Sequence, residues 1–333
     1  MISSSKIFSN VLSIVKAIGQ WLRYNAQTNQ TAIVALVLSI GVLYYGFYLD
    51  IYKILATIWT ILILEIAIQI YKYWVGSIRF SGAFNALWGI SFFLRSDEII
   101  IYILAGALAI LWKYTFTTQE GRHFMNPSNM AVTFCLIFFP LIVWTNPLQW
   151  GIYSTPEKTI LKNIAIFLLG ALISTRVQRL MHIPIWITTL SFFLTQAFIF
   201  AFFTEETTWQ QALIYFNPGF FVFIFFMITD PKTVPWTKIG HILHGMGIGI
   251  LFFILQYYIN ENYSNLLALF CMTLFLPFIW KLESKQWLFG LNQAHILQLG
   301  ILLIFIHLFA YNIYQNWFPD LIFDNRCRQL FCE

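Results

Sequence analysis

Residues 54–70 read ILATIWTILILEIAIQI, an apolar run that is interrupted by one carboxylate, Glu65. Such a run predicts a helix that crosses a lipid bilayer, because roughly 20 apolar residues span the hydrocarbon core. A carboxylate inside that helix is costly, so it is usually paired, protonated or functional. Two interpretations of Glu65 stay open: an acid hydrogen-bonded inside the protein, with Gln69 one turn away, or a protonatable group on an ion or substrate path.

The composition predicts an integral membrane protein of the all-α class. Of 333 residues, 59% are hydrophobic and only 10% are charged, whereas a soluble domain carries about 25% charged residues. The sequence contains no Walker A, G-x-S-x-G, H-E-x-x-H, C-x-x-C or dinucleotide motif. Soluble enzymology is therefore not expected, and any enzymatic role is that of a membrane subunit without its own catalytic domain. The basic residues lie in short loops, so nucleic acid is not a predicted partner.

The apolar runs predict about eleven transmembrane spans, at residues 31–49, 54–72, 82–94, 98–113, 128–145, 160–175, 183–203, 212–229, 239–259, 263–280 and 294–316. With the N-terminus inside, most lysines and arginines fall in inner loops, as the positive-inside rule requires. This orientation places the C-terminus outside and fits a bacterial cytoplasmic membrane. Residues 1–30 contain apolar side chains at helical spacing opposite Lys6, Lys16 and Arg23, which predicts an interfacial amphipathic helix.

The chain contains an internal repeat. Residues 126–135 read NPSNMAVTFC and residues 262–271 read NYSNLLALFC, so that Asn, Ser, Asn, Phe and Cys coincide without gaps. The two copies start on opposite sides of the predicted topology, as an inverted repeat of five spans requires. The predicted domains are thus an interfacial helix at 1–30, repeat one at 31–145, repeat two at 146–280, and an extra span with an outer tail at 281–333.

Several polar residues at predicted span ends are candidates for a site. Asn126, Ser128 and Asn129 can cap a helix that begins with Pro127, or they can hold an anionic or polar ligand group at the helix N-terminus. Asp230, which precedes Pro231, either caps the next turn or forms a cation or proton site. The full candidate set for an ion or substrate path is Glu65, Gln69, Ser81, Asn85, Asn126, Ser128, Asn129, Thr229 and Asp230.

Histidine and cysteine give weaker signals. His241 and His244 stand one turn apart, followed by Gly245, so they either hold a haem or metal or mark close helix packing. With no second histidine pair on an obvious facing helix, we predict no metal site. Cys327 and Cys332 lie in the outer tail, and we expect them to form a disulfide in an oxidising compartment.

Three segments together resemble a known family. They are Glu65 followed by RFSGAFNAL at 79–87, GRHFMNPSN at 121–129, and FMITDPKTVP at 226–235. In this order they resemble the NqrB component of the sodium-pumping NADH:quinone reductase and the RnfD component of the Rnf electron transport complex. The resemblance covers roughly residues 30–280. It implies two inverted five-helix repeats similar to urea channels, flavin-linked electron transfer coupled to ion movement, and partner subunits in the membrane.

The family also carries a Ser-Gly-Ala-Thr motif whose threonine holds FMN through a phosphoester. Here residues 149–156 read QWGIYSTP, so Thr155 has no small Gly-Ala pair before it. We therefore expect that any bound flavin (FMN or riboflavin) is not covalent. In this respect the chain resembles shorter relatives, such as the UnbU-like proteins of enediyne gene clusters, for which the family gives a fold and little chemistry.

Three functions follow from these observations. The chain is a membrane subunit of a redox-linked or ion-transport complex with a pathway between the repeats, a stand-alone channel or carrier for a small solute, or a structural anchor for a larger membrane assembly. Bound flavin distinguishes the first, solute flux without partners the second, and stoichiometric co-purification without either the third.

Overall fold

The computed structural model describes residues 26–45, 47, 49–73, 80–116, 123, 125–144, parts of 164–179, 182–203, 218–259 and 264–284. Four sequence predictions lie outside these residues: the interfacial helix up to residue 25, the covalent-flavin position Thr155, the span at 294–316, and the Cys327–Cys332 disulfide.

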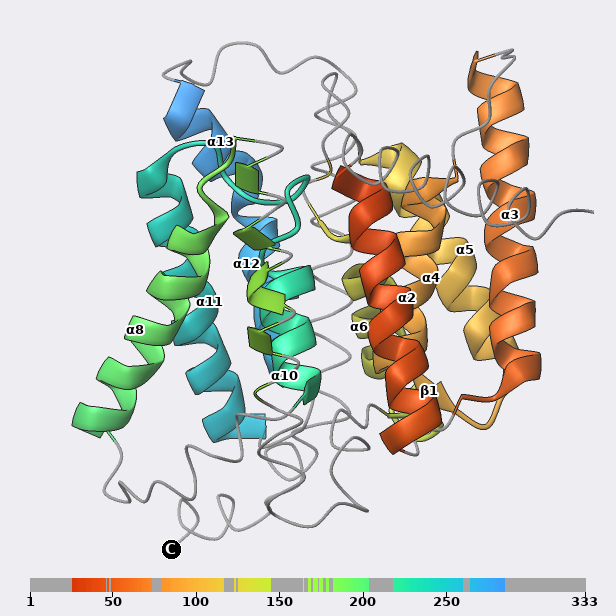
Figure 1. Cartoon of the computed structure of the whole chain (residues 1–333), viewed down its shortest axis with the longest axis horizontal. Helices are drawn as coiled ribbons and strands as arrows, with labels where there is room; N and C mark the ends of the chain where they lie inside the picture. Colours follow the sequence, from red (N-terminus) through yellow and green to blue (C-terminus); the bar gives the residue numbers. More distant parts are fainter. Residues whose placement is uncertain are drawn as a thin grey trace, which may run out of the picture.

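The described chain is mostly helical, and its helices form two groups that lie side by side (Figure 1). The first group consists of α2 (Ala26–Tyr45), α3 (Ile51–Tyr73), α4 (Ser81–Phe93), α5 (Ile99–Thr115) and α6 (Pro127–Phe138). The second consists of α8 (Ile185–Phe203), α10 (Pro218–Val222), the π-helix η2 (Phe223–Met227), α11 (Lys238–Ile259), α12 (Ser264–Leu274) and α13 (Leu276–Ser284).

The two groups pack by similar helix pairs. In the first group α3 packs against α5, and α5 against α6; in the second, α8 packs against α11, and α11 against α12. The groups meet where α6 contacts α12, near the centre of the molecule (Figure 1). Two short strands, β1 (Arg95–Ser96) and β2 (Val143–Trp144), pair antiparallel beside the first group, with Arg95 opposite Trp144.

Helix α3 carries its polar residues on its buried side. Thr57, Ile61, Glu65 and Gln69 follow one another at four-residue spacing, and all four are buried; this spacing puts them on one face of a helix. The opposite face is apolar and exposed, with Trp59 63% and Tyr71 88% accessible. Polar residues that face the protein interior, with an apolar face outside, are typical of a helix in a membrane.

Two helices of the described chain are long and apolar enough to cross a bilayer by themselves, at Ile51–Tyr71 and Lys238–Gln256. Shorter apolar helices accompany them at Val34–Leu43, Ile99–Thr115, Pro127–Phe138, Ile185–Ile199 and Ser264–Leu274. Large apolar side chains are also exposed on helices of both groups, among them Leu43, Leu194 and Ile239. These features indicate an integral membrane protein.

Two predicted spans are shorter than the sequence suggested. The span predicted at 128–145 is helix α6 only to Phe138, because Pro140 cannot continue the ladder of helical hydrogen bonds. The span predicted at 263–280 is interrupted by a turn at Phe275, two residues before Pro277, and becomes α12 and α13. In both places a proline overrides the apolar pattern.

We expect Gly89→Ala to weaken the contact between α4 and α6. A Cβ atom at Gly89 is 2.2 Å from Ser128 Oγ and 2.5 Å from Ser128 Cβ, so the helices must separate, which typically costs about 1–3 kcal/mol. The control is Gly106→Ala in α5, where the added Cβ meets Thr57 and Ile61 at 3.4–3.5 Å. Thermal unfolding in detergent should show a lower Tm for Gly89→Ala only; equal Tm values in the two variants contradict the prediction.

Candidate functional site

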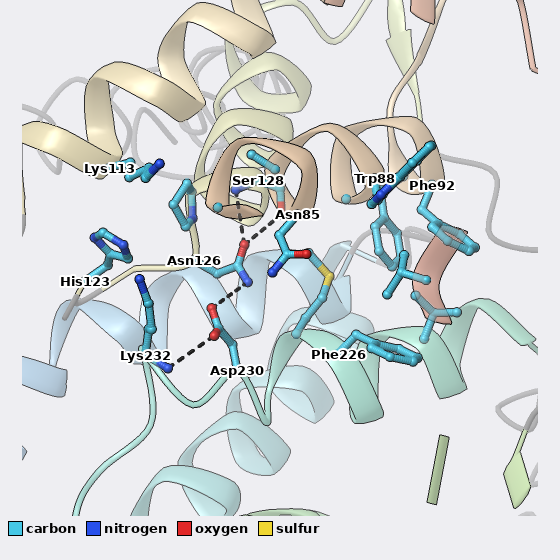
Figure 2. A pocket seen from close by; sticks show the side chains of 18 of the residues that line it. Asn85, Trp88, Phe92, Lys113, His123, Asn126, Ser128, Phe226, Asp230 and Lys232 are labelled. Carbon is cyan, nitrogen blue, oxygen red and sulfur yellow. Dashed lines mark hydrogen bonds between the residues drawn. The ribbon is translucent and has the colours of Figure 1, made fainter. Parts of the chain in front are cut away.

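A cavity of about 390 Å³ lies between the two helix groups. Its walls come from α4 and α6 of the first group, from η2, and from the loop that follows η2 (Figure 2). Both α4 and α6 are short, with 13 and 12 residues. Short helices that end inside the protein present polar backbone and side-chain groups to an interior cavity, which is where membrane proteins tolerate such groups.

Asn126 caps helix α6 at the wall of this cavity. Its Oδ1 atom accepts hydrogen bonds from the backbone N–H groups of Ser128 and Asn129, at 3.1 and 3.2 Å, and from Ser128 Oγ at 2.7 Å. Pro127 occupies the first helical position, where its missing N–H has no consequence. The Asn-Pro-Ser-Asn motif therefore fixes the start of α6 and the direction of the Asn126 amide.

The amide of Asn126 also connects the two helix groups. Its Nδ2 atom donates to Asp230 Oδ2 at 3.1 Å, across 104 residues of sequence. The other carboxylate oxygen of Asp230 accepts from the backbone N–H of Lys232 at 3.2 Å, and Figure 2 shows both bonds in the middle of the site. Asp230 therefore serves as a turn cap and as a polar bridge between the groups.

Glu65 is fully buried and forms an ion pair beside the cavity. Lys113 Nζ lies 2.6 Å from Glu65 Oε1, and Gln69 Nε2 and Tyr114 Oη donate to the same oxygen at 2.8 Å. The sequence predicted the contact with Gln69 but not the contact with Lys113. The second oxygen, Oε2, is buried and has no hydrogen-bond partner in the part of the chain that the structure describes.

Two basic side chains in loops complete the polar end of the cavity. Lys232 and His123 both line it (Figure 2). Burial lowers the pKa of Lys232, while the charge of Asp230 opposes that shift. Burial, with help from the positive charges of Lys232 and Lys113, lowers the pKa of His123 to about 3. His123 is therefore neutral at pH 7 and presents a polar ring without adding charge.

The other end of the cavity is aromatic. Trp88 and Phe92 of α4 and Phe226 of η2 lie there, away from the lysines (Figure 2). The indole Nε1 of Trp88 is buried without a hydrogen-bond partner among the described residues. The π-helix η2 brings Phe226 and Met227 to the wall, and π-helical turns are frequent at functional sites. The cavity thus has one charged end and one aromatic end.

The predicted site residues fall into three groups. Asn85, Asn126, Ser128 and Asp230 line the cavity, and Glu65 and Gln69 adjoin it through Lys113. Asn129 and Thr229 are buried away from it: Asn129 Nδ2 donates to Leu266 O of α12, and Thr229 Oγ1 to Phe225 O. Ser81 begins α4, and its side chain is outside the described residues, as is Thr155.

Sequence reasoning missed Lys113, His123 and the aromatic wall. Lys113 stands near the end of an apolar run, where a lysine usually reaches the lipid head groups, and its partner is 48 residues away. The sequence indicated only that Glu65, a carboxylate inside the membrane, needs a positively charged partner.

The described residues contain no group of three or more His, Cys, Asp or Glu that can hold a metal ion. His241 and His244 are fully buried in α11. His241 Nδ1 lies 2.6 Å from Thr188 Oγ1 of α8, and Gly245 allows α8 to approach so closely that an added Cβ is 2.4 Å from Thr188 O. His241 and Gly245 therefore take part in the packing of α8 against α11.

A model of the NQR2, RnfD, RnfE family matches residues 158–288, which is less than half of the chain. The match includes α8 to α13, with Asp230 and Lys232, whereas Glu65, Lys113 and Asn126 on the other side of the site precede it. It supports a relationship to the NqrB and RnfD proteins at the level of the family. No curated protein matches the chain.

Proposed function

We propose that this protein is a membrane subunit of a redox-linked, ion-translocating complex, and that the cavity between the helix groups is its functional site. The observation that carries the proposal is the cavity itself. It combines the carboxylate of Asp230, two lysines and an aromatic wall inside a membrane protein, with a second carboxylate, Glu65, paired to Lys113 beside it, and the family match supplies the redox link. Ionisable residues are rare in membrane interiors and mark ion, proton or substrate pathways.

We propose a flavin, held without a covalent bond, as the ligand of the cavity. A volume of about 390 Å³ is in the range of small-molecule sites, roughly 300–1,000 Å³. The residues fit a planar ring with polar edges: Trp88 and Phe226 provide aromatic contacts, and the buried Trp88 Nε1 is a donor that lacks a partner among the described residues. Asn85 provides a further amide in the cavity wall. A bound flavin supplies the electron-carrying ring.

We further propose about eleven spans in two inverted repeats, residues 31–145 and 146–280, with an interfacial helix before them and an extra span and tail at 281–333. What supports the repeat is the equivalent order of packing, α3–α5–α6 in one group and α8–α11–α12 in the other. The helices that follow the two Asn-x-Ser-Asn sequences, α6 and α12, also contact each other.

The proposed setting is the bacterial cytoplasmic membrane, with the N-terminus inside and Cys327 and Cys332 joined in an outer tail. The partners are the lipid bilayer and other membrane subunits. The polar path through the protein then comprises Glu65, Lys113, Asn126 and Asp230, together with Asn85 and Ser128. Thr229 and Asn129 lie outside this path, and their side chains hold the surrounding helices in place by donating to the backbone carbonyls of Phe225 and Leu266.

Blocking the cavity tests the proposal. Ala86 is buried in the cavity wall, and Ala86→Trp is expected to fill the space and remove the flavin that co-purifies with the wild-type protein from its native membrane. The matched control is Ala67→Trp, which adds the same side chain to the exposed face of α3. Absorbance and mass spectrometry of acid-released flavin provide the measurement.

Flavin loss of at least about tenfold in Ala86→Trp, with full occupancy in Ala67→Trp, supports the proposal. Absence of flavin from the wild-type protein, or equal flavin in both variants, contradicts it.

A stand-alone channel or carrier is the second candidate, since the cavity also lies where a solute path between the groups would pass. Solute flux in liposomes without partner subunits, blocked by Ala86→Trp, is the result expected for that function.

A further inference from the structure

Lys113 belongs to two sites at once. Its ammonium lies 2.6 Å from Oε1 of the fully buried Glu65. The Lys113 side chain also lines the cavity. Figure 2 shows Lys113 on the same side of the cavity as His123, with Asn126 and Asp230 at its centre. A charge in the cavity can therefore act on Glu65 by attracting or repelling the ammonium of Lys113.

The partners of Glu65 are distributed unevenly. Three donors, from Gln69, Lys113 and Tyr114, point to Oε1, whereas Oε2 is buried without a partner in the described part of the chain. An ionised carboxylate can accept about four hydrogen bonds on its two oxygens, and an unsatisfied buried acceptor costs about 1–3 kcal/mol. A small cation on Oε2 satisfies this atom, and a proton there removes the charge of the carboxylate. Either one is needed only if Lys113 no longer supplies the neutralising charge.

Lys113 stands at the wall of the cavity, next to a second carboxylate. Its side chain crosses α4 at Gly82, where an added Cβ is 3.0 Å from Nζ and 3.2 Å from Cε. The cavity that Lys113 lines also contains the carboxylate of Asp230 and the ammonium of Lys232. The two lysines and two carboxylates sum to zero charge, so the site is balanced as it stands. If one negative charge is added to the cavity, the site becomes neutral again only when it binds one positive charge.

We propose that Lys113 is a tethered counter-cation: an anionic group in the cavity draws its ammonium away from Glu65, and Glu65 then takes up one proton or one monovalent cation. This inference rests on the proposed function. The charges balance, because one negative charge enters the cavity and one positive charge arrives at Glu65. Gln69 and Tyr114 keep the carboxylate in place, and Lys113 acts as a positioning residue. The titratable groups that face Glu65 in the described chain are Lys113, Tyr114 and, farther away, Lys232.

Infrared difference spectroscopy of the full chain in liposomes tests the first half of the inference. In sodium-free buffer at neutral pH, wild type should show no protonated-carboxyl band from Glu65. Lys113→Met should show such a band, and the double variant Glu65→Gln/Lys113→Met should lose it. Lys113→Gln replaces Lys113→Met if the latter does not fold. The control Lys53→Met removes a lysine that pairs with Asp50 and does not line the cavity, and it should show no band.

Sodium distinguishes the two possible occupants. If adding Na⁺ removes the band of Lys113→Met, Glu65 takes a metal cation; if the band persists, it takes a proton. No Glu65-dependent band in Lys113→Met and Lys113→Gln without sodium, or a band already present in wild type, overturns the inference.

Asn85→Asp tests the second half, because it adds one negative charge to the cavity without any ligand. We expect a Glu65-dependent carboxyl band in Asn85→Asp that is absent from Asn85→Asp/Glu65→Gln. The matched control is Asn129→Asp, the same change at a buried residue outside the cavity wall. A spectrum of Asn85→Asp without that band at every pH at which the protein stays folded refutes the coupling. These readouts need neither flavin nor partner subunits, so they can fail while the flavin proposal stands.

Discussion

The Glu65→Leu variant is expected to lose about 3–5 kcal/mol of unfolding free energy, the usual effect of removing one partner of a buried ion pair. Lys113, only 12% exposed, is then left without its carboxylate, and Tyr114 and Gln69 lose their acceptor. Lys113→Leu is expected to cost a similar amount. Unfolding in mixed micelles, followed by tryptophan fluorescence, gives the two values.

The double variant Glu65→Leu/Lys113→Leu is the decisive comparison. Because an apolar replacement of a buried pair is often neutral or stabilising, the double variant should lose much less than the sum of the two single variants. The control pair is Lys53 with Asp50, whose nitrogen and oxygen are 3.3 Å apart at partly exposed positions. Asp50→Asn should change stability much less than either single variant of the buried pair, because exposed ion pairs contribute little. Additive losses at Glu65 and Lys113 would show that the two residues act independently.

The helices and caps that depend on residues close together in the chain could be predicted from the sequence. The expected span at 82–94 is α4 at Ser81–Phe93, and the expected span at 98–113 is α5 at Ile99–Thr115. The Asn126 cap was visible because its bonds reach only two and three residues ahead. Such features can be read from the sequence because the chain itself brings their partners together.

Contacts between distant parts of the chain were not visible in the same way. Asn126 meets Asp230 across 104 residues, and Glu65 meets Lys113 across 48. Each residue carried a polar signal by itself, but the pairing depends on how α3, α5, α6 and η2 pack. The aromatic wall carried no signal at all, since Trp88 and Phe226 are two among 64 aromatic residues in an apolar chain. A rich aromatic composition hides the few rings that line a cavity.

Asp230→Asn is expected to lower stability by about 1.5–3 kcal/mol, the usual contribution of a hydrogen bond to a charged group, and to abolish ion translocation by the complex proposed above. Two hydrogen bonds to its carboxylate are donated by Asn126 Nδ2 and by the backbone N–H of Lys232. A carboxylate accepts on both oxygens, whereas an amide has one acceptor and one donating group. Whichever way the amide is turned, one donor faces another donor. Lys232 also loses its counter-charge.

Exchanging the two side chains distinguishes hydrogen bonding from the position of the charge. In Asn126→Asp/Asp230→Asn, the new carboxylate can still cap α6, since Asp and Asn are equally good N-caps, and it can accept from the amide at position 230. We expect the exchange to restore most of the unfolding free energy that Asp230→Asn loses. If translocation also returns, a negative charge anywhere in this bridge is sufficient; if stability returns alone, the charge must stand on the loop beside Lys232. An exchange variant no more stable than Asp230→Asn would mean that the bond between Asn126 and Asp230 does not hold the helix groups together.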